Sequence, residues 1–139
     1  MTPTAAPALA GFLLLLGSAS APSAADRAEC LCLLDSTTSA VEGAVRIFES
    51  RRPGSPGVTA AAERALTAAT EARDLLEAAP LSPPCGPSSA EELIYLNHLI
   101  PGFRGWLNAK GRRPPADYDI ASIIRRARAH RERGRARLR

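Results

Sequence analysis

The sequence predicts an all-α fold: a small bundle of three to four helices, with a kinked third helix and one disulfide, that follows a cleaved signal peptide. Four segments carry apolar residues every three to four positions, as amphipathic helices do, and none alternates strictly as a half-buried strand does. A short apolar stretch and a run of small residues open the chain. The three cysteines are an odd set, which allows one internal disulfide.

Residues 1–25 have the pattern of a secretory signal peptide. Their apolar core, Leu9–Leu16, is shorter than a helix that crosses about 30 Å of hydrocarbon. Ser23 and Ala25 occupy the −3 and −1 positions of a signal-peptidase site. No Lys or Arg precedes the apolar core, so an uncleaved signal that anchors the chain in the membrane is the alternative. We expect a bacterial protein that is cut after Ala25 and is periplasmic or secreted, where thiols oxidise.

The first predicted helix runs from about Asp26 to Ser50 and ends at the proline- and glycine-rich segment 51–57. Its apolar stripe consists of Leu31, Leu34, Thr38, Val41, Val45 and Phe48. Charged residues are expected on the opposite side, at Asp35, Glu42, Arg46 and Glu49. The second predicted helix spans 59–79, and its inner face consists of Ala62, Ala65, Leu66, Ala69, Ala72, Leu75 and Leu76. Alanine favours the helix and lets a neighbouring helix approach closely.

The third predicted helix begins at Ser88 and Ser89, each of which is followed three residues later by a glutamate, Glu91 or Glu92. This spacing matches two overlapping capping boxes, in which a serine and a glutamate satisfy the first backbone N–H groups of a helix. Pro101 lies further along the same apolar pattern. We therefore expect either a kink there or a division into two short helices.

The fourth predicted helix begins at Asp117 or Asp119 and is expected to dissolve into the arginine-rich end. Its buried residues are expected to be Ile120, Ile123, Ile124 and Ala127. The chain thus divides into a signal peptide (1–25), a helical domain (26–124) and an arginine-rich C-terminal tail (125–139). The length left after the signal peptide is enough for one modest core.

The cysteines stand at Cys30, Cys32 and Cys85. If the first two helices form an antiparallel hairpin, Cys85 returns to the neighbourhood of the other two. At about 100° per residue, Cys30 lies within about 40° of the centre of the apolar stripe, whereas Cys32 points about 160° away. We expect a Cys30–Cys85 disulfide worth roughly 3–4 kcal/mol and a free Cys32. Pairing of Cys32 instead stays open, because the first turn of a helix frays.

The chain lacks the sequence motifs of catalysis and of cofactor binding. No serine-hydrolase elbow, zinc-protease motif, phosphate loop or dinucleotide fingerprint is present. His98 is expected to have a structural role and His130 to be exposed within the arginine run. The spacing of Cys30 and Cys32 is not that of a structural zinc site. We expect a protein that is not an enzyme and that holds no metal and no cofactor.

Two groups of residues are candidates for binding. Residues 120–139 hold eight arginines and one acid, a net charge of +7, while residues 1–119 carry −3. Such a basic end either binds anionic material, such as lipid head groups or lipopolysaccharide, or is a solvated terminus. Its candidate residues are Arg125, Arg126, Arg128, Arg131, Arg133, Arg135, Arg137 and Arg139.

The second group contains the residue types that anchor protein interfaces and lies just before the basic end. Its candidates are Arg104, Trp106, Arg112, Arg113 and Tyr118, and Trp106 is equally expected in the core.

The stretch from Cys85 to Ala127 resembles the C-terminal half of the small periplasmic immunity proteins that neutralise type VI secretion amidases. The resemblance is carried by Cys85-Gly86-Pro87, Glu92-Leu93, Pro101, Pro115-Ala116 and the segment Ile120 to Ile124. It implies an inhibitor whose protein partner is a cell-wall hydrolase in the cell envelope. The family usually has a second disulfide near the C-terminus, whereas this chain ends in arginines. We expect a non-enzymatic periplasmic interaction protein, with no nucleic-acid partner.

Overall fold

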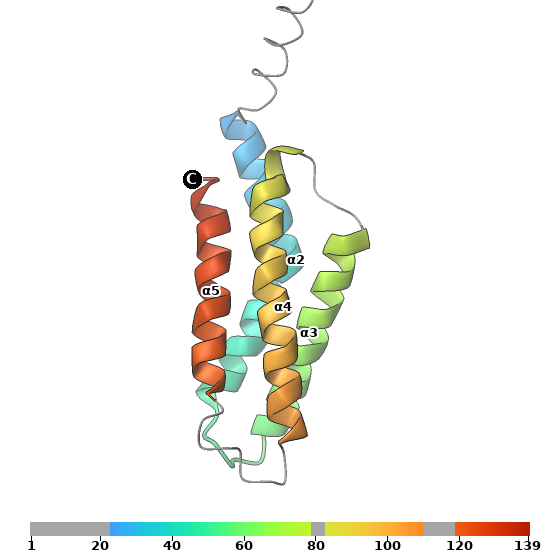
Figure 1. The fold of residues 1–139 in the computed structure, drawn as a ribbon, viewed down its shortest axis with the longest axis vertical. Helices are drawn as coiled ribbons and strands as arrows, with labels where there is room; N and C mark the ends of the chain where they lie inside the picture. Colours follow the sequence, from blue (N-terminus) through green and yellow to red (C-terminus); the bar gives the residue numbers. More distant parts are fainter. Residues whose placement is uncertain (1–22, 79–82, 110–118) are drawn as a thin grey trace, which may run out of the picture.

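The fold was analysed in a computed structural model, which describes residues 23–78, 83–109 and 119–139. These residues form four α-helices and one short 3₁₀ turn (Figure 1). The elements are α2 (Ala24–Ser50), α3 (Val58–Ala78), η1 (Pro83–Cys85), α4 (Gly86–Asn108) and α5 (Ile120–Ala136). Within the described ranges there is no strand, so the predicted all-α class is confirmed. No helix in these ranges combines the length and the apolar character that a membrane span requires.

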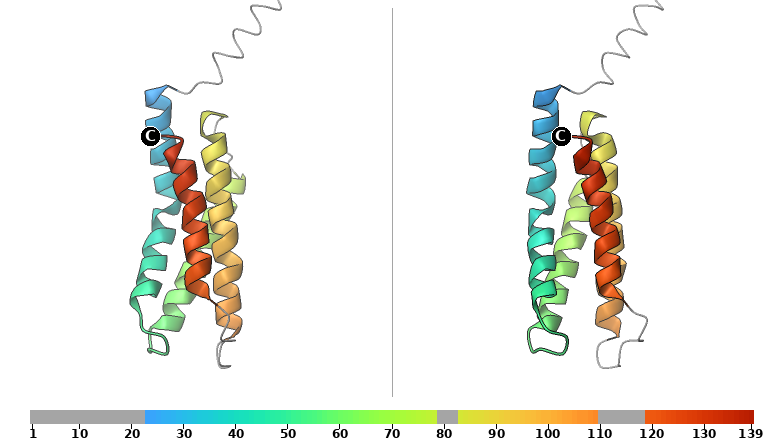
Figure 2. Two further views of the ribbon diagram at one scale, coloured as in Figure 1. Left: turned by 60° about the vertical axis from the view of Figure 1, so that its left-hand side comes forward. Right: turned by 90° about the vertical axis from the view of Figure 1, so that its left-hand side faces the viewer.

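Consecutive helices of the bundle run in opposite directions (Figures 1 and 2). Helix α3 packs against α2 and α4, and α5 packs closely along α4. The C-terminus therefore returns to the end of the bundle at which α2 begins (Figure 1). This arrangement brings the two termini of the described chain into one neighbourhood.

Helix α2 begins with a side-chain cap. The hydroxyl of Ser23 accepts a hydrogen bond from the backbone N–H of Asp26 at 3.1 Å, and the Asp26 carboxylate accepts one from the Ser23 N–H at 3.2 Å. The expected signal peptide lies mostly in residues 1–22, outside the described part of the chain. A cut after Ala25 falls within the first turn of α2, so a processed chain would begin without this cap.

The core follows the predicted apolar faces with one exception on each of the first two helices. Val41, Val45 and Phe48 of α2 are buried as expected. The four predicted alanines of α3 are at most 3% exposed: Ala62, Ala65, Ala69 and Ala72. Leu75, expected in the same face, is instead 63% exposed, because it lies a quarter-turn away from Leu76, which fills the core. Glu42 was expected to face outward but is only 7% exposed, and its partners explain why.

Helix α4 begins earlier than predicted, and the two capping boxes are wrong. The turn η1 leads directly into Gly86, and a proline occupies the first turn, where its missing N–H costs nothing. Ser88 and Ser89 therefore lie inside the helix, buried, and the Ser88 hydroxyl donates to the carbonyl of Gly134 at 2.6 Å. Pro101 sits inside α4, which continues to Asn108. The alternative of two short helices is thus not observed. A proline inside a helix causes a kink because it has no backbone N–H to donate to the preceding turn.

The Cys30–Cys85 disulfide is confirmed. It joins the first turns of α2 to η1, with 5.4 Å between the Cα atoms and a sequence separation of 55 residues. Cys32 is exposed and free. Leu34 and Leu138 pack against the disulfide in a small second core cluster. The last turn of the chain is therefore fixed to α2.

The expected tail from residue 125 does not exist as a separate region. Helix α5 continues without interruption to Ala136, and Leu138 beyond it is only 4% exposed. The helix does not dissolve at Ile124, because its inward face continues with Ala127 and with arginines whose charges are matched by buried carboxylates. Residues 125–139 thus belong to the helical domain.

Candidate functional site

Helices α4 and α5 approach each other closely through a glycine near each end of their contact. A Cβ atom added at Gly134 of α5 would lie 2.8 Å from Glu91 Cβ and 3.0 Å from the carbonyl oxygen of Ser88. A Cβ added at Gly102 of α4 would lie 2.8 Å from a methyl carbon of Ile123. At each glycine a larger residue would force a neighbouring atom to shift. Helix α5 therefore lies close to α4 and reaches α2 through long polar side chains.

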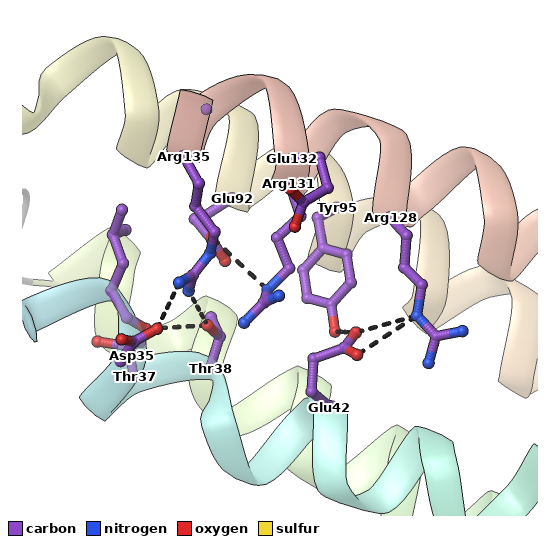
Figure 3. A network of polar contacts seen from close by, with 12 residues as sticks. Asp35, Thr37, Thr38, Glu42, Glu92, Tyr95, Arg128, Arg131, Glu132 and Arg135 are labelled. Carbon is purple, nitrogen blue, oxygen red and sulfur yellow. Dashed lines mark hydrogen bonds and ion pairs between the residues drawn. The ribbon is translucent and has the colours of Figure 1, made fainter. Parts of the chain in front are cut away.

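The C-terminal end of this polar contact is built around Arg135 (Figure 3). Its Nε donates to Glu92 at 3.0 Å, one terminal nitrogen pairs with Asp35, and the other donates to the Thr38 hydroxyl at 3.2 Å. Arg135 is 6% exposed and Glu92 is fully buried. One guanidinium thus ties α5 to both α4 and α2.

The middle of the contact joins a tyrosine to an acid and a second arginine. The hydroxyl of Tyr95 donates to Glu42 at 2.5 Å, which explains why Glu42 can be buried. The guanidinium of Arg131 lies 5.7 Å from the centre of the Tyr95 ring, in cation–π range, and its Nε is 3.8 Å from Glu92. Burial, followed by the hydrogen bond to Glu42, raises the pKa of Tyr95, so the phenol stays protonated and remains a donor.

The third inward arginine, Arg128, binds two carboxylates of α2. Its two terminal nitrogens lie 2.8 and 2.7 Å from the two oxygens of Glu49, a bidentate pair. Its Nε is 3.3 Å from Glu42. Figure 3 shows Arg128, Arg131 and Arg135 in one row along α5, facing α2.

Glu92 is the most deeply buried charge of this network. Burial raises its pKa, while Arg135 and Arg131 act in the opposite direction. Its second oxygen, Oε2, is buried without a hydrogen-bond partner in the described part of the chain. Because an unpaired buried carboxylate is costly, the network fixes the rotation and the depth of α5 against its neighbours.

The opposite side of α5 carries a second set of arginines, which we call the outer arginine face: Arg126, Arg133 and Arg137. Their spacings of seven and four residues place them on one side of a helix. All three are exposed. Arg133 contacts His130 at 3.0 Å, and within the described ranges Arg126 and Arg137 have no side-chain partner. Among the described residues, no carboxylate forms an ion pair with these three arginines.

The remaining two candidate arginines have local partners. Arg125 donates to the Ser122 hydroxyl at 2.8 Å, and Arg139 lies 3.5 Å from Glu132. The eight candidates therefore divide into three that point inward, three on the outer arginine face and two at its side. Sequence reasoning treated them as one group.

The expected group of aromatic and arginine residues is not assembled by the described residues. Arg104 and Trp106 are two positions apart on α4, so their side chains point about 160° apart. Arg104 is exposed, whereas Trp106 is partly buried and packs edge-on against Phe48 with 5.3 Å between ring centres. Arg112, Arg113 and Tyr118 lie outside the described residues.

The two histidines lie together on the outer side of α4 and α5. Their ring centres are 5.1 Å apart, and His130 Nδ1 is 2.9 Å from a Glu91 oxygen. His98 Nδ1 lies 2.8 Å from the carbonyl of Ile94, in agreement with the structural role expected for it. Over the described ranges, no three His, Cys, Asp or Glu side chains are placed to hold a metal ion.

Sequence reasoning missed Glu42, Glu92 and the inward arginines as one network. A signal for it was present, because the inward positions continue the apolar spacing of α5 to its end: Ile124, Ala127, Arg128, Arg131, Arg135 and Leu138.

Comparisons with protein-family models, with curated proteins and with solved structures found no match to this chain. The resemblance to the immunity proteins therefore stays a prediction from sequence.

Proposed function

We propose that this chain is a non-enzymatic, exported helical protein that binds an acidic protein partner through the outer arginine face. One observation carries the proposal: three exposed arginines, without a carboxylate partner among the described residues, stand in a row on a helix whose opposite side is packed on α4 and ion-paired to α2. A rigid surface loses little conformational entropy on binding. Arginine also binds carboxylates in a bidentate manner and is enriched at protein interfaces.

The geometry of α5 favours a protein partner over a lipid surface. A helix that binds a membrane inserts its apolar side between the lipids. The apolar residues of α5 face the bundle, and Ile124, Ala127 and Leu138 are at most 4% exposed. The outer side offers charge without an apolar anchor, which suits the carboxylates of a folded protein.

Export is part of the proposal. A disulfide such as Cys30–Cys85 forms in oxidising compartments, and the sequence of residues 1–25 has the pattern of a signal peptide. A narrower version is inhibition of a cell-wall hydrolase in the periplasm. Its support is the sequence resemblance alone.

The test must leave α5 in place, because deleting residues 125–139 would also remove Arg135 and Leu138 from the core. A triple variant of the outer arginine face, R126E/R133E/R137E, changes the charge at three exposed positions, and among the described residues the one side-chain contact it alters is that of Arg133 with the half-buried His130. The matched control, R52E/R64E/R104E, makes the same charge change at three other exposed arginines. Both variants and the wild type are used to capture partners from envelope extract, and each captured protein is purified and its affinity measured by calorimetry.

We expect the outer-face variant to bind the purified partner at least about 100-fold more weakly, since charge reversal places like charges in contact. The control variant should stay within about threefold of the wild type, because rim charges away from a contact contribute little. Equal losses in both variants, or no protein captured, contradict the proposal.

A second candidate function uses the same face: electrostatic binding of anionic envelope material such as lipopolysaccharide. The observation in its favour is that Arg126 and Arg137 have no ion-pair partner among the described residues. It predicts binding that collapses as salt rises, because exposed charges are screened within about 10 Å at 0.1 M salt. The outer-face variant should then bind purified lipopolysaccharide more weakly than the control variant does, and the wild type should capture no protein, which distinguishes this function from recognition of a protein.

A further inference from the structure

An open pocket of about 330 Å³ lies at the end of the bundle away from the disulfide. The end of α2, the start of α3, the last turns of α4 and the first turn of α5 meet there (Figure 1). Its apolar wall consists of Phe48, Pro53, Val58, Trp106, Ile120, Ala121 and Ile124. This volume is within the range of small-molecule sites, which are mostly apolar with a few polar groups.

Among the described residues, two charged ones complete the lining, Glu49 and Arg51. The Glu49 carboxylate is already bound at both oxygens by Arg128, at 2.8 and 2.7 Å. Arg51 has no ion pair within the described ranges, and its guanidinium lies over Gly57, where a Cβ atom would be 3.7 Å from its central carbon. The charge left unmatched at the pocket is therefore positive.

We propose that this pocket binds a small carboxylate with a compact apolar body. The apolar body lies against Trp106, Phe48 and Ile120, and the carboxylate pairs with Arg51. An anion is favoured over a neutral ligand because a guanidinium–carboxylate hydrogen bond is stronger than a neutral one. A cationic ligand is disfavoured, because the one acid of the pocket is already paired. The site is separate from the outer arginine face and does not depend on the function proposed for it.

The chain contains a single tryptophan, Trp106, so intrinsic tryptophan fluorescence reports this pocket directly. The full mature chain is titrated with decanoate, and in parallel with the neutral decanol, below their aggregation concentrations. We expect a saturable fluorescence change with decanoate and binding of decanol that is weaker by about tenfold or more, as loss of a charged hydrogen bond implies. Calorimetry repeats the measurement without relying on fluorescence.

Two pairs of variants locate the site. R51Q should weaken the binding of decanoate by about tenfold and leave the binding of decanol unchanged. R52Q, at an exposed neighbour outside the pocket, should change the affinity for neither. Ala121 lines the pocket and is exposed, so A121L fills it and should abolish both titrations. Ala129 is an exposed alanine of the same helix outside the pocket, and A129L should bind as the wild type does.

The proposal is overturned if neither probe gives a saturable change, or if decanol and decanoate bind equally. It is also overturned if A121L binds decanoate as well as the wild type does. Circular dichroism melting of each variant establishes that it is folded. If A121L does not fold, the comparison of decanoate affinity between R51Q and R52Q still tests the proposal, since Arg51 and Arg52 are exposed and belong to no core cluster.

Discussion

The two sides of α5 carry the same residue type in opposite surroundings. Arg128 and Arg135 face the bundle and pair with acids of α2 and α4, while Arg126 and Arg137 face solvent and have no partner in the described chain. The acids that bind Arg135 lie 43 and 100 residues away in sequence. A basic segment therefore shows how much charge a helix carries, whereas only the fold shows how much of it is available to a partner.

The comparison also separates two roles within one element. The inward arginines anchor α5 between its neighbours, and the outer ones form a surface on that anchored helix. An exposed arginine costs little to change, because exposed charges contribute about 0–1 kcal/mol each. A buried arginine that neutralises a buried acid is different, since its removal leaves that acid unpaired. Stability measurements should therefore divide the arginines of α5 into the same two groups.

The largest effect is expected for Arg135→Ala. The substitution leaves Glu92 fully buried with its nearest cation gone, and we expect a loss of about 3–5 kcal/mol of unfolding free energy. Arg137→Ala, two residues further on and exposed, should stay within about 0.5 kcal/mol of the wild type. Urea unfolding followed by circular dichroism measures both.

A compensating variant sharpens this prediction. The double variant Glu92→Leu/Arg135→Leu replaces both members of the ion pair, so no unpaired charge is left buried. It should therefore recover most of the unfolding free energy that Arg135→Ala loses. Asp35, the other acid at Arg135, has a side chain that is 59% exposed and can be solvated instead. Equal stability of the Arg135→Ala and Arg137→Ala variants would show that the buried network does not hold α5.

The next largest effect is expected at the glycine where α5 meets α4. Gly134→Ala places a methyl group 2.8 Å from Glu91 Cβ and 3.0 Å from a backbone oxygen, neither of which is a flexible side-chain end. We expect a loss of about 1–3 kcal/mol, as in other overpacked contacts. Gly43→Ala, in the middle of α2 with nothing within 4 Å of the added atom, should instead gain about 0.5–1 kcal/mol.

Opposite signs for these two identical substitutions would establish that α5 sits as close to α4 as described. If Gly134→Ala stabilised the protein as Gly43→Ala does, the two helices would have to lie further apart. The inward arginines would then no longer reach their acids in the geometry of Figure 3. Thermal melting of the two variants is sufficient, because only the sign of the change is required.

The helices and the disulfide were predictable from local pattern. The stripe of Val41, Val45 and Phe48 has the helical period, and the direction of Cys30 within that stripe favoured it over Cys32, whose pairing the structure then excluded. The start of α4 was not predictable in this way, because Ser88 forms its hydrogen bond with Gly134, 46 residues away, in place of a local cap. Local chemistry offered the serine two roles, and tertiary packing selected one.

The candidate site was less predictable, for the same reason. The sequence pattern placed Glu42 on the charged side of its helix and Glu92 in a capping box, whereas both carboxylates are buried. They are buried because arginines from α5 neutralise them, and that pairing depends on how closely α5 packs on α4. Trp106 packs on Phe48, as its expected role in the core describes, and it also lines a pocket. Its expected role in a protein interface stays a prediction.

The smallest expected effect is a dependence of stability on pH that comes from Glu92. Because burial raises the pKa of Glu92 in the folded state, the folded chain keeps a proton that the unfolded chain loses above the ordinary value of 4.5. Unfolding free energy should therefore fall as pH rises from that value, by at most about 1.4 kcal/mol per pH unit for one proton, until the folded-state pKa is passed.

Glu92→Gln removes this titration and keeps the shape of the side chain, and Asp35 remains as a carboxylate partner for Arg135. The difference in unfolding free energy between the wild type and Glu92→Gln, measured in urea from pH 4 to 8, should shift in favour of the variant as pH rises. A difference that stays constant, or that shifts in favour of the wild type, would mean that Arg135 and Arg131 outweigh burial at Glu92. The attraction between Glu92 and the inward arginines would then exceed the cost of burying them. In that case Arg135→Ala would destabilise the protein through the loss of a favourable ion pair, and not only because it leaves Glu92 buried without a partner.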